Sequence, residues 1–191
     1  PRPAGSGSPR TPLFRRADAF IRQALGEDIY GIDEESLAVV TGALLQERGW
    51  MLATAESCTG GLIGASLTEA AGSSRWFKGG VIAYANGIKE ALLDIDPELL
   101  ARHGAVSAEV AQAMAQGAVR RLDCDIAVSA TGIAGPEGGS DDKPVGTVYL
   151  GLCCGGSLSH RLCHFYGSRR QIQEKTAQTA MDMVRRALLS R

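Results

Sequence analysis

A chain of 191 residues that is 45% hydrophobic and 21% charged can bury one good core, and its length favours a single domain. A formal net charge of -1 lacks the strongly basic character of nucleic-acid-binding domains, so we expect a small-molecule partner and no nucleic acid. No stretch approaches the roughly 18 uncharged apolar residues of a membrane-spanning helix, and the first residues lack the apolar core of a signal peptide, which predicts a cytoplasmic protein without membrane contact.

The first 35 residues are predicted to lie outside the main domain. Residues 1–12 are rich in Pro, Gly, Ser and Arg and cannot bury apolar surface, so we expect a disordered linker or tail. The lack of an initial Met suggests a processed or excised piece. Over residues 13–28 apolar side chains recur at helical spacing, which predicts a short amphipathic helix within a lead-in segment of residues 13–35. The main domain is expected over residues 36–191.

Helices and strands alternate through the first part of this domain, and a hairpin and a long helix follow. A predicted helix over 34–48 ends at Gly49, and the apolar run at 50–56 has the length of a buried strand. The order predicts an α/β fold in which helices cover both faces of a mixed, mostly parallel sheet of about five strands, one of them antiparallel. The other predicted strands are 80–85, 125–132, 146–154 and 158–166, and the other predicted helices are 61–71, 87–95, 97–104, 107–123 and 168–190.

The cysteines and histidines show no pattern of a disulfide framework or a metal site. The five cysteines are an odd set without C-x-x-C spacing, and the three histidines lack an H-E-x-x-H pattern. We therefore expect reduced thiols and neither a metal nor an organic cofactor. The residues concerned are Cys58, Cys124, Cys153, Cys154, Cys163, His103, His160 and His164.

Polar residues follow three of the predicted strands at their carboxyl ends, where open α/β sheets bind ligands. The first strand ends in "AESCTGG", at the start of a helix whose amide groups favour anions. Tyr84, Asn86 and Lys89 follow the second strand. The third leads into "SATGIAGPEGGSDDKPVG", whose glycines allow the backbone to approach a ligand closely.

Each of these features also has a purely structural interpretation. The Ser and Thr residues are typical helix caps, Tyr84 fits a half-buried sheet aromatic, and Lys89 fits a solvated charge. The glycine-rich loop matches neither the dinucleotide nor the P-loop motif. Their position at one edge of the sheet favours a shared site, because a lysine with a lowered pKa can activate a serine without any histidine, and a tyrosine hydroxyl can relay protons.

The motifs "AESCTGG", "AGSSRWFKGGVIAYANGIKEALL", "HGAVS", "SATGIAGPEGG" and "KPVGTVYLG" resemble, in this order, the carboxyl-terminal amidohydrolase domain of the CinA family. The resemblance runs from about residue 37 to residue 189. It implies a three-layer α/β/α fold and a nicotinamide-nucleotide amidase, which converts nicotinamide mononucleotide to nicotinic acid mononucleotide and ammonia in the salvage of pyridine nucleotides. It further implies Ser57 as nucleophile, Lys89 as base and Tyr84 as the partner of that base.

The resemblance also indicates which residues contact the substrate. Arg169 falls at the family's arginine and is expected to bind the phosphate, although Ser168 stands where many relatives have an acidic residue. Amide groups near Cys58 to Gly61 are expected to stabilise the oxyanion, and Glu56 to orient the turn or a substrate hydroxyl. The full set of expected substrate contacts is Glu56, Cys58, Thr59, Gly60, Asn86, Thr131, Gly132, Gly135 and Arg169.

Residues 13–35 resemble the segment that precedes this domain in two-domain family members. The chain is therefore expected to be the carboxyl-terminal part of a longer protein with an amino-terminal domain, and to form a homo-oligomer. Two alternatives for the site remain open at this point. In one, Cys58 is the nucleophile, because thiolates near helix N-termini are activated. In the other, the domain is a non-catalytic nucleotide-binding or interaction module.

Overall fold

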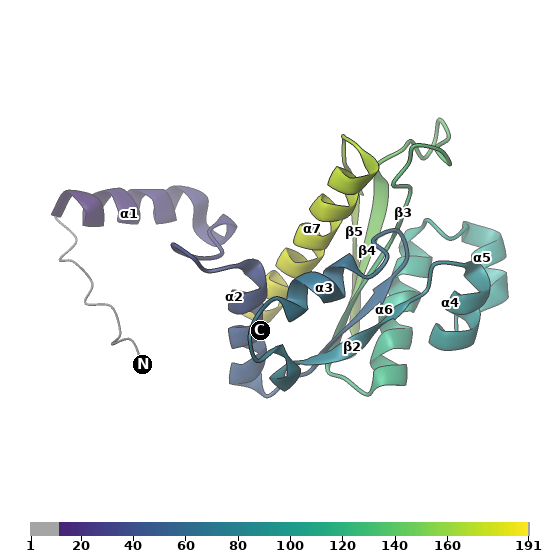
Figure 1. Cartoon of the computed structure of the whole chain (residues 1–191), viewed down its shortest axis with the longest axis horizontal. Coiled ribbons are helices and arrows are strands. Elements are labelled where there is room, and N and C mark those ends of the chain that lie inside the picture. Colours follow the sequence, from purple (N-terminus) through teal and green to yellow (C-terminus); the bar gives the residue numbers. More distant parts are fainter. Residues whose placement is uncertain (1–11, 191) are drawn as a thin grey trace.

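A computed structural model describes residues 12–190, so the tail predicted for residues 1–12 lies outside the described residues except for Pro12. Helix α1 (Pro12–Leu25) begins there and extends away from the rest of the molecule (Figure 1), with no buried side chain. A single 3-10 turn, η1 (Gly26–Asp28), follows it. The lead-in segment therefore contains the predicted helix.

The sheet has five strands in the order β2-β1-β3-β4-β5. β1 pairs in parallel with β2 and β3, whereas β4 runs antiparallel to β3 and β5, so one strand runs against the other four. This arrangement confirms the predicted mixed, mostly parallel sheet. The strands are β1 (Leu52–Glu56), β2 (Phe77–Ile82), β3 (Ile126–Gly132), β4 (Thr147–Cys154) and β5 (Ser157–His164).

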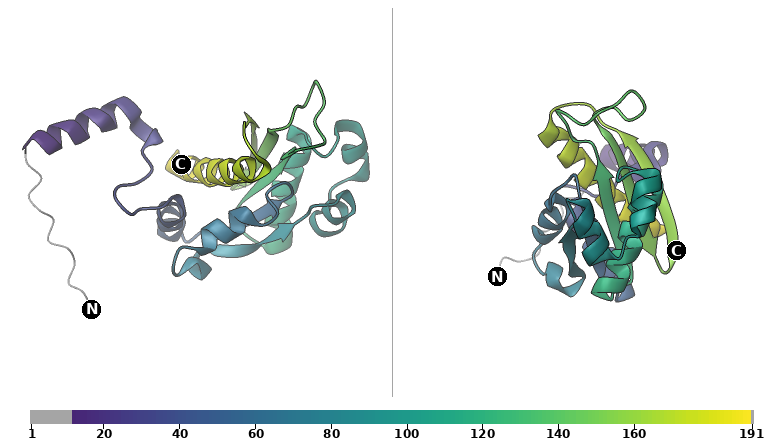
Figure 2. Two further views of the ribbon diagram at one scale, coloured as in Figure 1. Left: turned by 45° about the horizontal axis from the view of Figure 1, so that its top comes forward. Right: turned by 90° about the vertical axis from the view of Figure 1, so that its right-hand side faces the viewer.

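Helices cover both faces of the sheet, which confirms the three-layer α/β/α architecture (Figures 1 and 2). α2, α3 and α7 enclose one core cluster, which includes Leu45, Ile63 and Ile172, and α6 encloses a second one with Val110 and Met114. The short helices α4 and α5 pack against α6. The helices are α2 (Leu37–Arg48), α3 (Leu62–Thr68), α4 (Asn86–Leu93), α5 (Pro97–His103), α6 (Ala108–Leu122) and α7 (Arg169–Leu189).

The second strand begins and ends earlier than its sequence predicts. It was expected over 80–85, but β2 pairs with the five residues of β1 from Phe77 onward, and the pairing stops where Ile82 lies opposite Glu56. In this pairing Gly80 lies opposite Thr54, and a Cβ at Gly80 would lie only 2.2 Å from the Thr54 side chain. Because β1 has no further residue to pair with, the chain leaves the sheet before Tyr84 and turns into α4.

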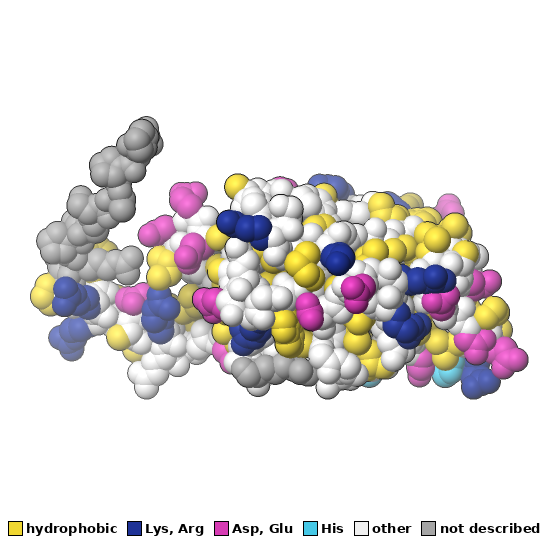
Figure 3. Space-filling view, turned by 90° about the horizontal axis from the view of Figure 1, so that it is seen from below, with side chains coloured by type: hydrophobic (Ala, Val, Ile, Leu, Met, Phe, Trp, Pro, Cys, Tyr) yellow, Lys and Arg dark blue, Asp and Glu magenta, His cyan; other side chains and the backbone are white. Residues whose placement is uncertain are grey.

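Capping residues begin and end several helices. Ser168 begins α7 with a capping box that includes Gln171, and Ser107 caps α6. Gly49 ends α2 in the left-handed conformation, with φ 64°. Within residues 12–190 no helix has the length and apolarity that a membrane span needs. Charges of both signs are interspersed over the face shown in Figure 3, as expected for a chain of net charge -1.

Candidate active site

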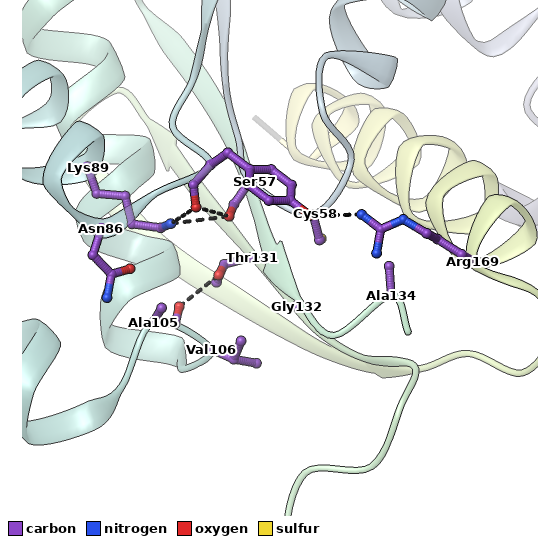
Figure 4. A pocket seen from close by; sticks show the side chains of 11 residues that line it. Ser57, Cys58, Asn86, Lys89, Ala105, Val106, Thr131, Gly132, Ala134 and Arg169 are labelled. Carbon is purple, nitrogen blue, oxygen red and sulfur yellow. Dashed lines mark hydrogen bonds between the residues drawn. The ribbon is translucent and has the colours of Figure 1, made fainter. Parts of the chain in front are cut away.

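A cavity of about 200 Å³ lies at the carboxyl ends of β1 and β3, beside the start of α4 and the start of α7 (Figure 4). It brings together eight of the residues that the sequence singles out, from segments far apart in the chain. Ala105, Val106 and Ala134 complete its wall. The eight predicted residues that line the cavity are Ser57, Cys58, Tyr84, Asn86, Lys89, Thr131, Gly132 and Arg169.

Lys89 lines this cavity and is only 1% exposed. Its Nζ atom lies 3.2 Å from Ser57 Oγ, 2.9 Å from the carbonyl oxygen of Ala83 and 3.0 Å from that of Tyr84. Burial disfavours the charged ammonium and lowers the pKa of Lys89 below its usual value. The side chain is therefore not the solvated charge that its position near a helix start allows.

Ser57 follows β1 directly, and its backbone amide donates to the carbonyl of Ala130 on β3 at 2.9 Å. This bond fixes the residue at the end of the sheet. Its Oγ contacts Lys89 Nζ and lies 3.5 Å from the carbonyl oxygen of Tyr84. The sequence separates Ser57 and Lys89 by 32 residues, and the parallel pairing of β1 and β2 brings them together.

Glu56 points away from the cavity and caps α3. Its buried carboxylate accepts hydrogen bonds from the amides of Gly61 and Ile63, both at 3.0 Å, and of Gly64, at 2.8 Å. Of the two roles expected for Glu56, this geometry suits orientation of the turn. The amides of this helix start, expected to favour an anionic ligand, already bind the chain's own carboxylate.

The hydroxyl of Tyr84 is held by Arg169 rather than by Lys89. Arg169 Nη2 donates to Tyr84 Oη, and Nη1 to the carbonyl of Gly135, each at 2.8 Å. Among the described residues, no hydrogen bond joins the Tyr84 hydroxyl to Ser57 or Lys89. Tyr84 is 59% exposed, which does not fit a half-buried sheet aromatic. Its contact with Lys89 is made through the backbone carbonyl.

The glycine-rich loop after β3 is attached to the turn before α6. Thr131 Oγ1 donates to the carbonyl of Ala105, and Lys143 Nζ to that of Val106, both at 2.7 Å. Gly132 has no room for a side chain, since a Cβ would lie 2.7 Å from Val148. The residue-based reasoning missed the contribution of this turn, although it contains the quoted "HGAVS" motif.

The residues after Ser57 form a tight turn beneath the cavity. The Cys58 thiol is buried, which raises its pKa to about 12. Thr59 is buried as well, and Gly60 adopts a left-handed conformation with φ 62°. Gln173 of α7, which the sequence reasoning also missed, donates to the carbonyl of Cys58 at 2.9 Å. Glu56, Thr59, Gly60 and Gly135 do not line the cavity.

No three His, Cys, Asp or Glu side chains within residues 12–190 are grouped as a metal site would require. Among the described residues, Cys58, Cys124, Cys153 and Cys163 form no disulfide.

A family model described as the CinA C-terminal domain matches residues 34–188. The chain belongs to this family. It is 48% identical over 177 residues to a CinA-like protein of Desulfotalea psychrophila and 51% identical over 180 residues to one of Thermosynechococcus vestitus. Each alignment covers 93% of this chain and 43% of the relative, so the chain spans less than half the length of these curated relatives.

Solved structures of CinA proteins share the fold. A CinA superfamily protein of Klebsiella pneumoniae has a TM-score of 0.78 at 34% identity, with 81% of this chain and 97% of that chain covered. The competence/damage inducible protein CihA of Agrobacterium tumefaciens has a TM-score of 0.77 at 42% identity, with 84% and 98% covered. The near-complete coverage of both structures shows that this CinA domain also occurs as a separate chain in solved structures.

Proposed function

We propose that this CinA domain is an amidohydrolase that converts nicotinamide mononucleotide to nicotinic acid mononucleotide and ammonia. The observation that carries the proposal is the pairing of Ser57 with a buried lysine at the end of an open cavity. A serine needs a base to become a nucleophile, and a lysine with a lowered pKa is a base of this kind. The substrate itself comes from the family resemblance.

The neighbours of Lys89 suit a neutral amine. A neutral amine has two hydrogens and one lone pair, and two carbonyl oxygens, those of Ala83 and Tyr84, lie within hydrogen-bond distance of Nζ. When both hydrogens are donated to these carbonyls, the lone pair is left for the Ser57 hydroxyl at 3.2 Å. This arrangement prepares Lys89 to accept the serine proton.

In the proposed reaction Ser57 Oγ attacks the carboxamide carbon while its proton moves to Lys89 Nζ. The tetrahedral intermediate then expels ammonia, which leaves with the proton that Lys89 returns, and Ser57 remains acylated. Water attacks the acyl carbon, Lys89 takes one proton from it and returns that proton to Ser57 Oγ, and the acid product leaves and gives its remaining proton to the released ammonia, which yields the carboxylate and ammonium. Every proton is accounted for by the serine, the lysine and one water molecule.

Arg169 is the residue that we propose for the substrate phosphate. It lines the cavity, and its guanidinium already lies between Tyr84 and Gly135. A planar guanidinium matches phosphate oxygens in charge and geometry, so a phosphate replaces one or both of these neutral acceptors on binding. The amides at the start of α3 already bind the Glu56 carboxylate, so they do not bind the phosphate. Arg169 supplies the positive charge for the phosphate instead.

Cys58 is a poor nucleophile in this structure. A thiol whose pKa is raised to about 12 remains protonated at neutral pH, whereas the thiolate is the reactive form. Its Coulombic neighbours include Glu56, which raises the pKa further. Ser57 is therefore the better candidate.

The proposed location, chain organisation and assembly of the domain are those that the family resemblance implies. We infer that it works in the cytoplasm, as part of a longer protein with an amino-terminal domain and as a homo-oligomer. The greater length of the curated relatives supports the second of these inferences.

Ammonia release from nicotinamide mononucleotide tests the proposed function, with free nicotinamide as the comparison substrate. We expect turnover of the mononucleotide by the wild type and by Cys58→Ala, and none by Ser57→Ala. Activity of Ser57→Ala with loss in Cys58→Ala would identify the thiol as nucleophile. No turnover by the wild type would favour a non-catalytic nucleotide-binding module, and equal rates on nicotinamide would contradict a phosphate contact.

A further inference from the structure

Two backbone amides directly after Ser57 are left without a partner residue. In the turn that follows β1, the amide of Gly60 donates to Ser57 and that of Leu62 to Thr59. The amides of residues 61, 63 and 64 donate to Glu56. Within the described part of the chain, the Thr59 amide has no acceptor, and the Cys58 amide faces only its own thiol. An amide beside a nucleophile that has no acceptor is available to a developing oxyanion.

Gln173 holds the peptide that joins Cys58 and Thr59. Its Nε2 atom donates to the carbonyl of Cys58 at 2.9 Å from α7, across 115 residues of sequence. In a trans peptide the carbonyl and the following N–H lie in one plane and point in opposite directions. A fixed direction for the Cys58 carbonyl therefore fixes the direction of the Thr59 amide.

The two ends of the turn are anchored by different elements. Glu56 holds the end that enters α3, and Ser57 is held to β3 through Ala130. Between these anchors Gly60 adds no packing contact on its open side, because no atom lies within 4 Å of the place where its Cβ would be. The Gln173 bond is the third anchor, and the one that acts on the peptide next to the nucleophile.

We propose that Gln173 is a positioning residue, which orients the Cys58–Thr59 peptide, and through it the adjoining Ser57–Cys58 peptide, so that the amides of Cys58 and Thr59 bind the oxyanion formed at Ser57. The inference deepens the proposed function and rests on its serine nucleophile. Gln173 does not touch the substrate in this scheme. It acts through the peptide that it holds, so its loss should affect the transition state more than the bound substrate.

The kinetic test compares three variants on α7. Gln173→Met keeps the length of the side chain and removes the donor, and Gln173→Arg keeps a donor. Gln178→Met makes the same chemical change at an exposed position of the same helix. Loss of a direct oxyanion donor costs on the order of 100-fold in kcat, so for a misoriented one we expect about a 10-fold or greater loss in Gln173→Met.

The expected pattern separates positioning from a general loss of structure. In Gln173→Met kcat falls, KM for the mononucleotide stays within about twofold, and the pH midpoint set by Lys89 stays unchanged. Gln173→Arg restores most of kcat, and Gln178→Met behaves as wild type. A wild-type kcat in Gln173→Met would overturn the inference, and so would an equal loss in Gln173→Met and Gln173→Arg.

A fluorophosphonate reagent tests the same inference without the natural substrate. Ser57 Oγ forms a bond to phosphorus, fluoride leaves, Lys89 takes the serine proton, and the phosphoryl oxygen of the adduct occupies the oxyanion position. We expect wild type and Gln178→Met to be labelled at Ser57 and Gln173→Met to be labelled about 10-fold more slowly. If wild type is labelled but releases no ammonia, the proposed substrate is wrong and the labelling ratio still decides the role of Gln173. Equal labelling of wild type and Gln173→Met, or none of wild type, counts against that role.

Discussion

At the scale of single residues, the position of Lys89 determines how the site should respond to pH. Burial lowers its pKa, and only the neutral amine accepts a proton from Ser57. We therefore expect kcat/KM to rise with pH through the lowered pKa. Lys89 loses its proton in the folded protein at a lower pH than in the unfolded chain, where its pKa is about 10.4. Between these two pKa values the unfolded chain binds more protons, so the free energy of unfolding rises with pH. A pH–rate profile combined with denaturant unfolding at each pH measures both trends.

Replacing this lysine by arginine separates a base from a fixed charge. Lys89→Arg should reduce turnover to near background, because a guanidinium does not lose its proton in this pH range. Lys78→Arg, at an exposed position of β2, is the matched control and should keep the wild-type rate. Initial rates of ammonia release compare the two variants. A Lys89→Arg enzyme that retains most of the wild-type rate would show that Lys89 acts as a charge and that the base lies elsewhere.

The buried Cys58 thiol beside Ser57 should be unreactive toward alkylating reagents. With its pKa raised to about 12, Cys58 should resist alkylation by iodoacetamide at pH 8 in the native protein. In denaturant, where burial no longer acts, it should react as an ordinary cysteine. Mass spectrometry of tryptic peptides reports the modification at each site. If Cys58 were alkylated rapidly in the native protein and activity were lost with it, the result would support Cys58 as the nucleophile.

At the scale of elements, the cap of α3 is expected to stabilise both the helix and the turn that carries Ser57. Glu56→Gln replaces one acceptor oxygen by a donor, which disrupts up to three charge-assisted bonds from backbone amides. Hydrogen bonds to a charged group contribute about 1.5–3 kcal/mol each, so we expect a loss of about 2–3 kcal/mol in the free energy of unfolding. Glu69→Gln, at the exposed end of the same helix, should change little. Urea denaturation measures the difference, and equal stability of both variants would contradict the capping role.

The contact between α6 and β4 should not tolerate even one added methyl group. A Cβ at Gly151 would lie 2.2 Å from the carbonyl oxygen of Ala111, which also accepts a bond from Ser129. Gly151→Ala should therefore lower the free energy of unfolding by about 1–3 kcal/mol or more. Gly87→Ala, in α4 with open space around it, should be neutral or slightly stabilising. Thermal unfolding of the two variants provides the comparison.

The sequence predicts elements better than it predicts their contacts. Turn and cap residues such as Gly49 and Ser168 mark boundaries locally, which is why α2 and α7 fall where expected. β2 was misplaced because its limits depend on its pairing with β1, which is not a local property. The bond from Arg169 to Tyr84 spans 85 residues and redirects the hydroxyl that was expected to face Lys89. The partners of Gln173 and Lys143 likewise depend on how distant segments pack.

At the scale of the whole molecule, α1 should be dispensable for folding and for catalysis. None of its side chains is buried, and its apolar residues, which include Leu13, Phe14 and Phe20, are exposed. Removal of residues 1–25 should leave the unfolding midpoint and the rate of ammonia release unchanged, and it should improve solubility because the exposed apolar stripe is lost. Circular dichroism measures the unfolding midpoint, and the ammonia assay measures the rate.

A slightly longer truncation should have a different result. Removal of residues 1–31 also deletes η1, where Arg185 donates to the carbonyl of Glu27 and Arg186 to the Asp28 carboxylate. Arg185 is buried, so the loss of an acceptor leaves part of its guanidinium without a partner and should lower the unfolding midpoint. Equal midpoints for the two truncations would show that η1 contributes nothing to stability.

α7 follows every other described element of the domain in the chain, and this order has a consequence for synthesis. A nascent chain has already produced Ser57 and Lys89, with β1 and α4, before α7 is synthesised. Without α7 the cavity has no Arg169, the turn after Ser57 has no Gln173, and the core beneath α2 and α3 loses one of its three helices. The cavity is therefore completed only after α7 has been synthesised, and a polypeptide that stalls before α7 has Ser57 and Lys89 but neither Arg169 nor Gln173.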